Sequence, residues 1–485
     1  MKKIKYSIFI CAFLITGLMG CKKFLDVEPK GMDVLKKIDH YNGLFNNANL
    51  YNLANIRNIP GSLAYILGYP GTPVLMSDDV FSSATYLSTQ PLAYQNAFQW
   101  KDNIFQEEDE SSEWGTFYSM NYVYNVVANG VMSAEDGTEL RKKELLAEAR
   151  ANRAYMHLLQ VNYFAKPYNA ATASTDLGVP IVTVADAGGS NYTRATVKEV
   201  YDFIISELQA AIPDLPAQTV NRARLAKTAG LYILGQTYFW MGDYANALTQ
   251  LNLALATLPN TTVPFTIYNY NTLMPTWITT GQPWVGANKY PAQTLSTENI
   301  YLKVMSINWA TSRNTVFLKP ATYALYSAND QRKKFFYNNS TTNAVAAPGL
   351  PGQQRNGPVS YNWGPNLADL YLMIAECKAR ANDLTGAKTD LETFRKTRMP
   401  LTEATVTATT QVDLVKAVLD ERKREFAGTG FRWFDMRRLW KDAQYNNIDP
   451  THQLDGTTYT LTENRLALKI PPAILKLNPG MQDNQ

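Results

Sequence analysis

The chain has 485 residues and a formal net charge of +4 at neutral pH. Removal of the first 20 residues, which carry three lysines and no acidic residue, would lower this charge to +1. A nearly neutral chain lacks the concentrated basic face that a nucleic acid or another polyanion requires, so composition argues against such partners. Three cysteines, Cys11, Cys21 and Cys377, predict neither a disulfide framework nor a metal site made of cysteines.

The start of the chain has the pattern of a secretory signal that ends at a cysteine. A short basic stretch over residues 1–5 precedes an apolar run over residues 7–20, which is too short to span a bilayer comfortably. Small and aliphatic residues stand directly before Cys21, and this ending resembles the lipobox of bacterial lipoproteins. We therefore expect a signal peptide over residues 1–20, cleavage before Cys21, and acyl chains on that cysteine that anchor the protein.

Helical patterns occur on both sides of a long irregular middle segment. In the first part of the chain, candidate helices cover residues 33–53, 111–131, 138–165 and 196–211. The last has the clearest signals, because Thr196 and Glu199 form a capping box and Pro213 follows its end. An acidic run over residues 107–110 precedes the second helix, where negative charge favours the helix dipole, and this role is preferred over a metal site.

Residues 228–259 carry the spacing of a tetratricopeptide repeat, which is a pair of antiparallel helices. Gly235 and Ala247 are small where the two helices approach each other, and larger residues fill the seam between them. A second, less regular unit covers residues 371–398, and a further helix is expected over residues 412–427. Because such repeats need about three stacked units to bury their faces, we interpret the earlier helices as degenerate repeats.

Several motifs along the chain together carry a family resemblance. They are the lipidated start over residues 21–29, the helix motif over 148–163, the segment 372–376, the charged stretch 421–438, and the closing Ile470-Pro471 and Asn478-Pro479 pairs. This set resembles the SusD/RagB family, the surface nutrient-binding lipoproteins of Bacteroidetes. Thr429 departs from the acidic residue that is usual at its position, and the chain ends at Gln485 without the family's usual glycine–tyrosine-like finish.

The resemblance implies a mostly α-helical fold in which about four tetratricopeptide helix pairs pack against an irregular, loop-rich ligand-binding region. Together with the helix pattern, it divides the chain into a signal peptide over residues 1–20, a lipidated tether over 21–32, an N-terminal region over 33–259, an aromatic-rich insert over 260–366 and a C-terminal region over 367–485. It also implies lipid anchoring at the cell surface of the outer membrane. The implied partner is a SusC-like TonB-dependent transporter.

The insert is expected to be functional or to form a small subdomain, because structureless connections of this length are uncommon. Its aromatic side chains are the best binding candidates, since sugar rings stack on indole and phenol planes, while packing on the helices is the alternative role. These candidates are Tyr268, Tyr270, Trp277, Trp284, Tyr290, Trp309, Tyr361 and Trp363. Trp100 and Trp240 are interpreted as structural.

Two groups of charged residues have open interpretations. Asp78 and Asp79 lie in a second irregular segment, residues 65–100, where capping a turn, holding Ca²⁺ and accepting hydrogen bonds from sugar hydroxyls are the alternatives. No cofactor other than this Ca²⁺ is suggested. The charged stretch 421–438 is interpreted as a helix face with near-neighbour ion pairs, and not as a catalytic or binding site. Its Trp433 and Phe434 are expected to dock the next helix.

Signatures of common enzyme classes are absent from the sequence. There is no HExxH, GxSxG, P-loop, GxGxxG or CxxC motif, and His40, His157 and His452 are isolated from one another. The two catalytic carboxylates of a glycosidase are defined by their separation in space, so the absence of these motifs does not exclude a glycosidase. The preferred hypothesis is a non-catalytic binding protein that captures oligosaccharide and delivers it to the transporter. A peptide-binding protein, as the RagB branch implies, and a surface glycan hydrolase are the alternatives.

Overall fold

The computed structural model describes residues 35–53, 71–107, 112–189, 191–277, 290–306, 315–337, 354–355 and 360–485, together with residues 109, 357 and 358. This part of the chain is mostly helical, as predicted, and its sheets are all two-stranded. None of its helices combines the length and the apolar character that crossing a membrane requires. The predicted signal peptide and tether, with Cys21, lie outside the described residues, and so do Trp284 and Trp309.

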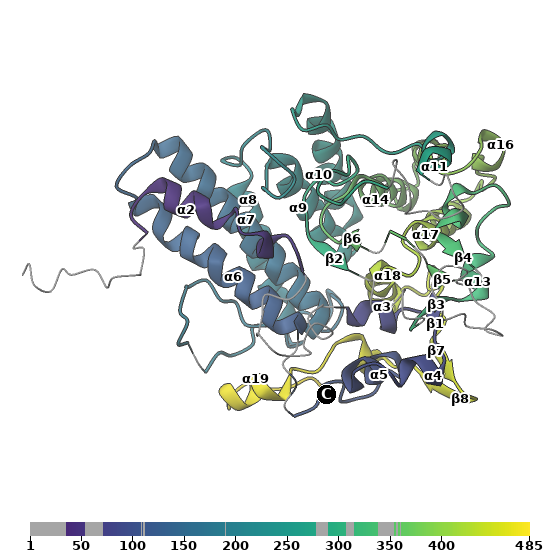
Figure 1. Ribbon diagram of the computed structural model, residues 1–485, viewed down its shortest axis with the longest axis horizontal. Coiled ribbons are helices and arrows are strands. Elements are labelled where there is room, and N and C mark those ends of the chain that lie inside the picture. Colours follow the sequence, from purple (N-terminus) through teal and green to yellow (C-terminus); the bar gives the residue numbers. More distant parts are fainter. Residues whose placement is uncertain are drawn as a thin grey trace, which may run out of the picture.

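A stack of paired helices forms the body of the molecule (Figure 1). Its members are α6 (Ser112–Gly130), α7 (Glu139–Phe164), α8 (Val197–Ala211), α9 (Lys227–Met241), α10 (Tyr244–Thr257), α14 (Leu367–Arg380), α15 (Leu384–Arg395) and α17 (Gln411–Glu425). From α6 to α10 each helix packs on the next, α14 packs on α10, α15 and α17, and one continuous hydrophobic core runs through the stack. This arrangement confirms the predicted helical repeat scaffold.

Local signals set the ends of these helices, which is why most predicted bounds hold to within a few residues. The Thr196 side chain accepts the backbone N–H of Glu199, and the Glu199 carboxylate accepts that of Thr196, so the predicted capping box opens α8. The helix predicted over residues 33–53 is shorter, since only α2 (Ile38–Leu44) and a 3₁₀ turn (Ala48–Leu50) form. The Asn47 side chain accepts the N–H of Asn49 there, a local bond that competes with a helix.

The helix pair α9–α10 shows why its seam needs small residues. A Cβ atom placed on Gly235 would lie 2.7 Å from Cγ of Leu251 on the facing helix, a contact that real side chains do not make. Ala247 is fully buried in the same pair. Gly242 ends α9 in the left-handed conformation, with a φ of 79°, which a glycine adopts without strain. The tetratricopeptide spacing therefore corresponds to a closely packed helix hairpin.

The segment before the stack is more regular than its composition suggests. It contains α3 (Thr72–Met76), α4 (Ala84–Leu87) and α5 (Leu92–Phe98). Helices α4 and α5 lie near the C-terminal hairpin of β7 (Thr451–Leu454) and β8 (Thr457–Thr460) in the lower part of Figure 1. The imidazole of His452 stacks between the rings of Phe98 and Trp100, with ring centroids 4.4 Å and 3.8 Å away. Trp100 therefore has the structural role that was predicted for it.

Much of the described part of the insert lies at the opposite end of the stack from α6 and α7 (Figure 1). Its described elements are α11 (Tyr270–Trp277), α13 (Pro320–Tyr323), β2 (Val304–Ser306), β3 (Phe317–Leu318), β4 (Phe336–Tyr337), β5 (Gln354–Arg355) and β6 (Ser360–Asn362). Strand β2 pairs with β6 and β4 with β5, while β3 pairs with β1 (Val80–Phe81) from the N-terminal region. Some insert residues join Ala427 in a second hydrophobic cluster, while others, such as Tyr301 and Met305, belong to the main core.

Three short helices complete the C-terminal region. They are α16 (Leu401–Ala404), α18 (Phe431–Leu439) and α19 (Pro472–Leu477). Helix α18 carries the end of the charged stretch and packs on α3. Its Phe434 ring stacks on Trp240 of α9, with centroids 5.4 Å apart and an interplanar angle of 13°. Phe434 thus docks on a repeat helix earlier in the chain and not on the helix that follows, and Trp240 is structural as predicted.

Candidate functional site

Four of the predicted aromatic candidates come together in the insert. The indole of Trp277 makes edge contacts with the rings of Tyr268, Tyr270 and Tyr290, at centroid distances of 5.4, 5.9 and 5.0 Å. Tyr270 and Trp277 are only 4% and 6% exposed, so their ring faces are already covered by protein. The described members of this cluster therefore pack against other protein side chains. Packing was the alternative role given to these residues.

Two other candidates lie apart from this group. The Tyr361 ring lies against the guanidinium of Arg355, which is 4.6 Å from the ring centroid. Trp363 is 4% exposed, and its Nε1 donates a hydrogen bond to the carbonyl oxygen of Thr429 at 3.1 Å. Its ring packs among aromatic side chains of the main core, so the geometry favours a structural role for Trp363.

A cavity of about 50 Å³ lies between the aromatic cluster and α17. Tyr270, Tyr290 and Tyr326 line it together with Arg355, whose pKa burial lowers to about 10. The volume accommodates a few water molecules and no sugar ring. Within the described residues, this cavity is a gap in the packing between the insert and α17 and is not itself a glycan site.

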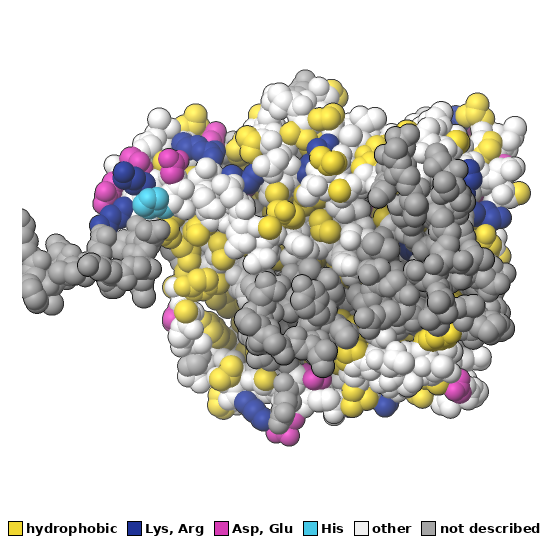
Figure 2. Space-filling model, in the orientation of Figure 1, with side chains coloured by type: hydrophobic (Ala, Val, Ile, Leu, Met, Phe, Trp, Pro, Cys, Tyr) yellow, Lys and Arg dark blue, Asp and Glu magenta, His cyan; other side chains and the backbone are white. Residues whose placement is uncertain are grey.

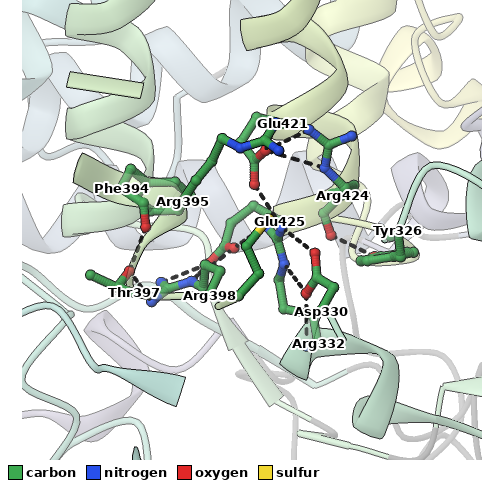
Figure 3. A network of polar contacts seen from close by, with 12 residues as sticks. Tyr326, Asp330, Arg332, Phe394, Arg395, Thr397, Arg398, Glu421, Arg424 and Glu425 are labelled. Carbon is green, nitrogen blue, oxygen red and sulfur yellow. Dashed lines mark hydrogen bonds and ion pairs between the residues drawn. The ribbon is translucent and has the colours of Figure 1, made fainter. Parts of the chain in front are cut away.

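The charged stretch 421–438 joins the insert to the helical stack through buried ion pairs (Figure 3). Arg332 of the insert lies 2.7 Å from Asp330, 2.6 Å from Glu421 and 2.9 Å from Glu425. Arg398, which is fully buried, also binds Glu425 at 2.9 Å. Removal of one partner from such a pair leaves an uncompensated buried charge, which costs about 3–5 kcal/mol. These charges hold the fold together.

The predicted near-neighbour pairs are only part of this network. Glu421 and Arg424, one turn apart on α17, do form an ion pair at 2.5 Å. Most other partners come from distant elements, such as Asp369 of α14, which accepts from Arg422 at 2.6 Å. The stretch is therefore structural, as interpreted from the sequence. Most of its ion pairs, however, join residues of different elements, and few join near neighbours on one helix.

Asp78 and Asp79 are buried beneath α18. Both carboxylate oxygens of Asp78 accept hydrogen bonds from Arg432, at 2.7 and 2.8 Å, and one also accepts from the backbone N–H of Asp449. Burial alone would raise the pKa of Asp78, but the charge and hydrogen bonds of Arg432 outweigh it and hold this pKa well below its ordinary value. This geometry favours a structural role for Asp78 over contact with a sugar.

Asp79 has a different environment from its neighbour. Its Oδ2 accepts the backbone N–H of Gly428 at 2.8 Å, while Oδ1 has no hydrogen-bond partner in the described part of the chain. Burial raises the pKa of Asp79 above its ordinary value. In the part of the chain that the structure describes, no group of three or more histidine, cysteine or acidic side chains is placed to hold a metal ion. The Ca²⁺ alternative thus finds no supporting ligand set there.

An open groove of about 460 Å³ lies between α6, the loop that precedes α8, and α19. Figure 2 shows hydrophobic side chains gathered around a hollow on the side of the molecule where Figure 1 places α6 and α19. Tyr118 and Tyr122, one turn apart on α6, form one wall, and Tyr192 and Leu477 contribute to the others. Tyr122 is 40% exposed, so its phenol remains available to a ligand.

One buried polar atom at this groove has no partner. Nδ2 of Asn121 donates to the carbonyl oxygen of Val182 at 2.8 Å, but its Oδ1 accepts nothing within the described residues. The groove thus combines aromatic walls with an unused acceptor, which is the usual composition of a pocket for a small polar ligand. The sequence did not indicate this site, because two of its walls, α6 and α19, are about 350 residues apart in the chain. The tyrosines at i and i+4 on α6 were the only local signal.

Both ring nitrogens of His157 and of His452 contact backbone groups. His157 donates from Nδ1 to the carbonyl oxygen of Arg153 at 2.8 Å and accepts the N–H of Val182 at Nε2. Burial lowers its pKa to about 4, so the ring is neutral at physiological pH. The ring nitrogens of His452 contact two carbonyl oxygens. Cys377 is buried and burial raises its pKa, which fits the predicted role of a small core residue.

Two family models match the chain and together span most of it. One, described as the SusD family, matches residues 273–485, and the other, described as "Starch-binding associating with outer membrane", matches residues 23–239. The chain belongs to the SusD/RagB family. This confirms the resemblance that its motifs carried. A search of curated proteins gives no match.

Solved structures of SusD-like proteins share the whole fold. A SusD superfamily protein from Bacteroides thetaiotaomicron is 18% identical, covers 93% of this chain with 100% of its own, and has a TM-score of 0.70. A SusD-like carbohydrate binding protein from Bacteroides vulgatus is 16% identical, with coverages of 92% and 97% and a TM-score of 0.63. A laminarin binding SusD-like protein is 17% identical, with coverages of 93% and 99% and the same TM-score. At these identities the likeness concerns the fold.

Proposed function

We propose that this SusD-like protein is a non-catalytic binding protein of the cell surface, which captures oligosaccharide and delivers it to a SusC-like TonB-dependent transporter. The observation that carries the proposal is the match of both halves of the chain to SusD-type family models, one of them described by starch binding and the outer membrane. A neighbour with the same fold is described as laminarin binding, which supports a glycan as the ligand. A lipid anchor at Cys21 would keep the protein beside the transporter.

The ligand contacts are proposed on the aromatic residues of the insert, and Trp284 and Trp309 are the most informative ones to test. Trp277 and Trp363 are buried in packing, so their replacement would report on stability as much as on binding. The groove beside α6 is a second candidate contact surface. Its support is the exposed phenol of Tyr122 together with the unused acceptor of Asn121.

The experiment is a binding screen of the soluble protein that lacks residues 1–21 against a broad panel of oligosaccharides and peptides. Binding is expected for at least one glycan, without release of any cleavage product during long incubation. Trp284→Ala or Trp309→Ala is expected to weaken that affinity by about tenfold, because a stacked aromatic contributes about 1–3 kcal/mol. Tyr122→Ala measures the contribution of the groove in the same assay, with unchanged thermal unfolding as the control for folding.

The outcomes separate the proposal from its alternatives. Binding of peptides and of no glycan would support the RagB-like peptide-binding alternative, and product release from a labelled polysaccharide would establish a hydrolase. If every aromatic variant retains full affinity for the bound glycan, the proposed contacts are wrong even though the proposed function stands. Co-purification with the transporter encoded beside it would test the partner directly.

A further inference from the structure

A second open pocket, of about 480 Å³, lies at the junction of α18 with the loop that follows α7. Its size is within the range of small-molecule sites. Apolar side chains, among them Met241, Trp440 and Leu466, form part of its lining, and the polar side chains of Asn169 and Thr172 face the same space. Its lining includes none of the described residues of the insert or of the groove beside α6.

Arg437 of α18 lines this pocket and is the unusual residue in it. The side chain is only 2% exposed, yet its single hydrogen bond within the described residues runs from Nη2 to the carbonyl oxygen of Ala165, at 2.8 Å. The Nε and Nη1 groups are buried and have no hydrogen-bond partner among the residues that the structure describes. A buried guanidinium normally has a carboxylate beside it, because an uncompensated charge in a protein interior is costly.

Every other charged side chain of the pocket already has a counter-charge. Lys166 pairs with Asp176 at 3.1 Å, and Lys441 pairs with Glu463 at 2.6 Å. The remaining two pair with residues outside the pocket: Arg438 binds Glu376 at 2.7 Å, and Asp442 binds Arg380 at 3.0 Å. Within the described residues, Arg437 has no acidic partner, so the pocket carries one uncompensated positive charge.

We propose that this pocket binds a small monoanionic ligand through Arg437, namely the carboxylate of an acidic sugar. One unpaired positive charge is balanced by one negative charge. A carboxylate carries a single negative charge, whereas a phosphate monoester carries more than one at neutral pH. A planar guanidinium also matches the geometry of a planar carboxylate. The volume leaves room for a pyranose ring, whose apolar face would lie on the apolar lining while its hydroxyls reach the polar side chains. The inference goes beyond the proposed capture of oligosaccharide, because it concerns a different pocket.

The test uses glucuronate as the probe and glucose as its neutral counterpart, with the soluble chain that lacks residues 1–21. Titration followed by ligand-observed NMR is expected to give a Kd for glucuronate at least about tenfold lower than for glucose, because hydrogen bonds to a charged group are stronger than those between neutral groups. Arg437→Gln is expected to remove this preference. Glucose 6-sulfate, also a monoanion, is the third probe.

A second pair of variants keeps Arg437 and all the ion pairs intact. Ala170 is an exposed residue that lines the pocket, while its neighbour Ala171 is also exposed and is not among the lining residues. Ala170→Trp is expected to obstruct the pocket and weaken glucuronate binding by about tenfold or more, and Ala171→Trp is expected to leave it unchanged. This comparison holds even if Arg437→Gln does not fold.

Three results would overturn the inference. They are equal affinity for glucuronate and glucose, a preference for glucose 6-sulfate with no glucuronate binding, and glucuronate binding that Ala170→Trp leaves intact. Retained glucuronate binding by Trp284→Ala and Trp309→Ala is expected. A protein that binds no neutral oligosaccharide but still prefers glucuronate would contradict the proposed function and support this pocket.

Discussion

At the scale of single residues, burial decides the role of most polar side chains in this protein. Asp78 and Arg432 are far apart in the sequence and form a buried pair, and His157 satisfies both ring nitrogens with backbone groups. In each case the side chain binds protein atoms and not solvent. Arg437 is the exception among these examples, because two of its donor groups remain unused. Within the described residues, these unused buried donors are the observation on which the proposed acidic-sugar pocket rests.

The neutral, buried state of His157 predicts a loss of stability in mild acid. Its pKa is about 4 in the folded protein and about 6.5 in an unfolded chain, so between these values only the unfolded state takes up the proton. The free energy of unfolding is expected to fall as the pH drops from 6.5 to 4, with about 3 kcal/mol of the loss due to this histidine.

Urea unfolding of the wild type and of His157→Gln at several pH values in this range measures that contribution. The difference in unfolding free energy between the two proteins should change with pH below 6.5 and be constant above it. A constant difference from pH 7 down to pH 4 would show that His157 does not remain neutral in the folded state.

At the scale of elements, the helix pairs are the part of the molecule whose sequence and structure agree best. Their seams are made by residues close in the sequence, so spacing alone reports them. Gly235 in α9 shows the physical constraint, because the facing Leu251 occupies the space that a side chain would need. Gly115 in α6 provides the contrast, since nothing lies within 4 Å of the position that its Cβ would take.

These two glycines give a matched pair of substitutions. Gly235→Ala is expected to lower the free energy of unfolding by about 1–3 kcal/mol, because overpacking forces the α9–α10 pair apart. Gly115→Ala is expected to raise it by about 0.5–1 kcal/mol, because alanine favours a helix and meets no neighbour here. Shifts of the urea midpoint measure both effects. Equal shifts for the two variants would contradict the proposed role of the seam.

At the scale of the whole molecule, the helical stack holds several surfaces in fixed positions around it. The insert lies at one end, the groove beside α6 at the other, and the Arg437 pocket between α18 and the loop after α7. The buried network around Arg332, Arg398 and Glu425 fixes the insert to α17. A ligand bound on the insert would therefore move with the whole body, which is compatible with the proposed delivery to a transporter.

The proposed anchor makes a prediction that concerns the intact protein. Cys21→Ala is expected to release the protein from the membrane fraction and to abolish labelling by fatty acid, because several acyl chains are needed for stable anchoring. Unfolding and glycan binding are expected to be unchanged. Cys377→Ala is the matched control, since that buried thiol has no part in anchoring and its variant should stay in the membrane fraction. Retention of Cys21→Ala in the membrane fraction would contradict the lipid anchor.

The sequence by itself determined the helices, the repeat spacing and the family. Caps such as Thr196 with Glu199, and seams such as Gly235 with Ala247, involve residues a few turns apart, so their pattern survives without the fold. It also singled out Trp277 and its tyrosine neighbours as binding candidates with packing as the alternative, but their gathering in one cluster is seen only in the structure.

Only the tertiary structure decided which side chains are covered and which face an open pocket. Asp78 and Trp363 looked like ligand contacts in irregular sequence, yet Arg432 and Thr429, both distant in the chain, occupy their polar atoms. The two open pockets arise where segments distant in the sequence meet. The same long-range packing leaves Arg437 without an acidic partner among the described residues, while the charged side chains near it are paired. Long-range packing leaves no local periodicity in a sequence, and this is why these sites were found only in the folded chain.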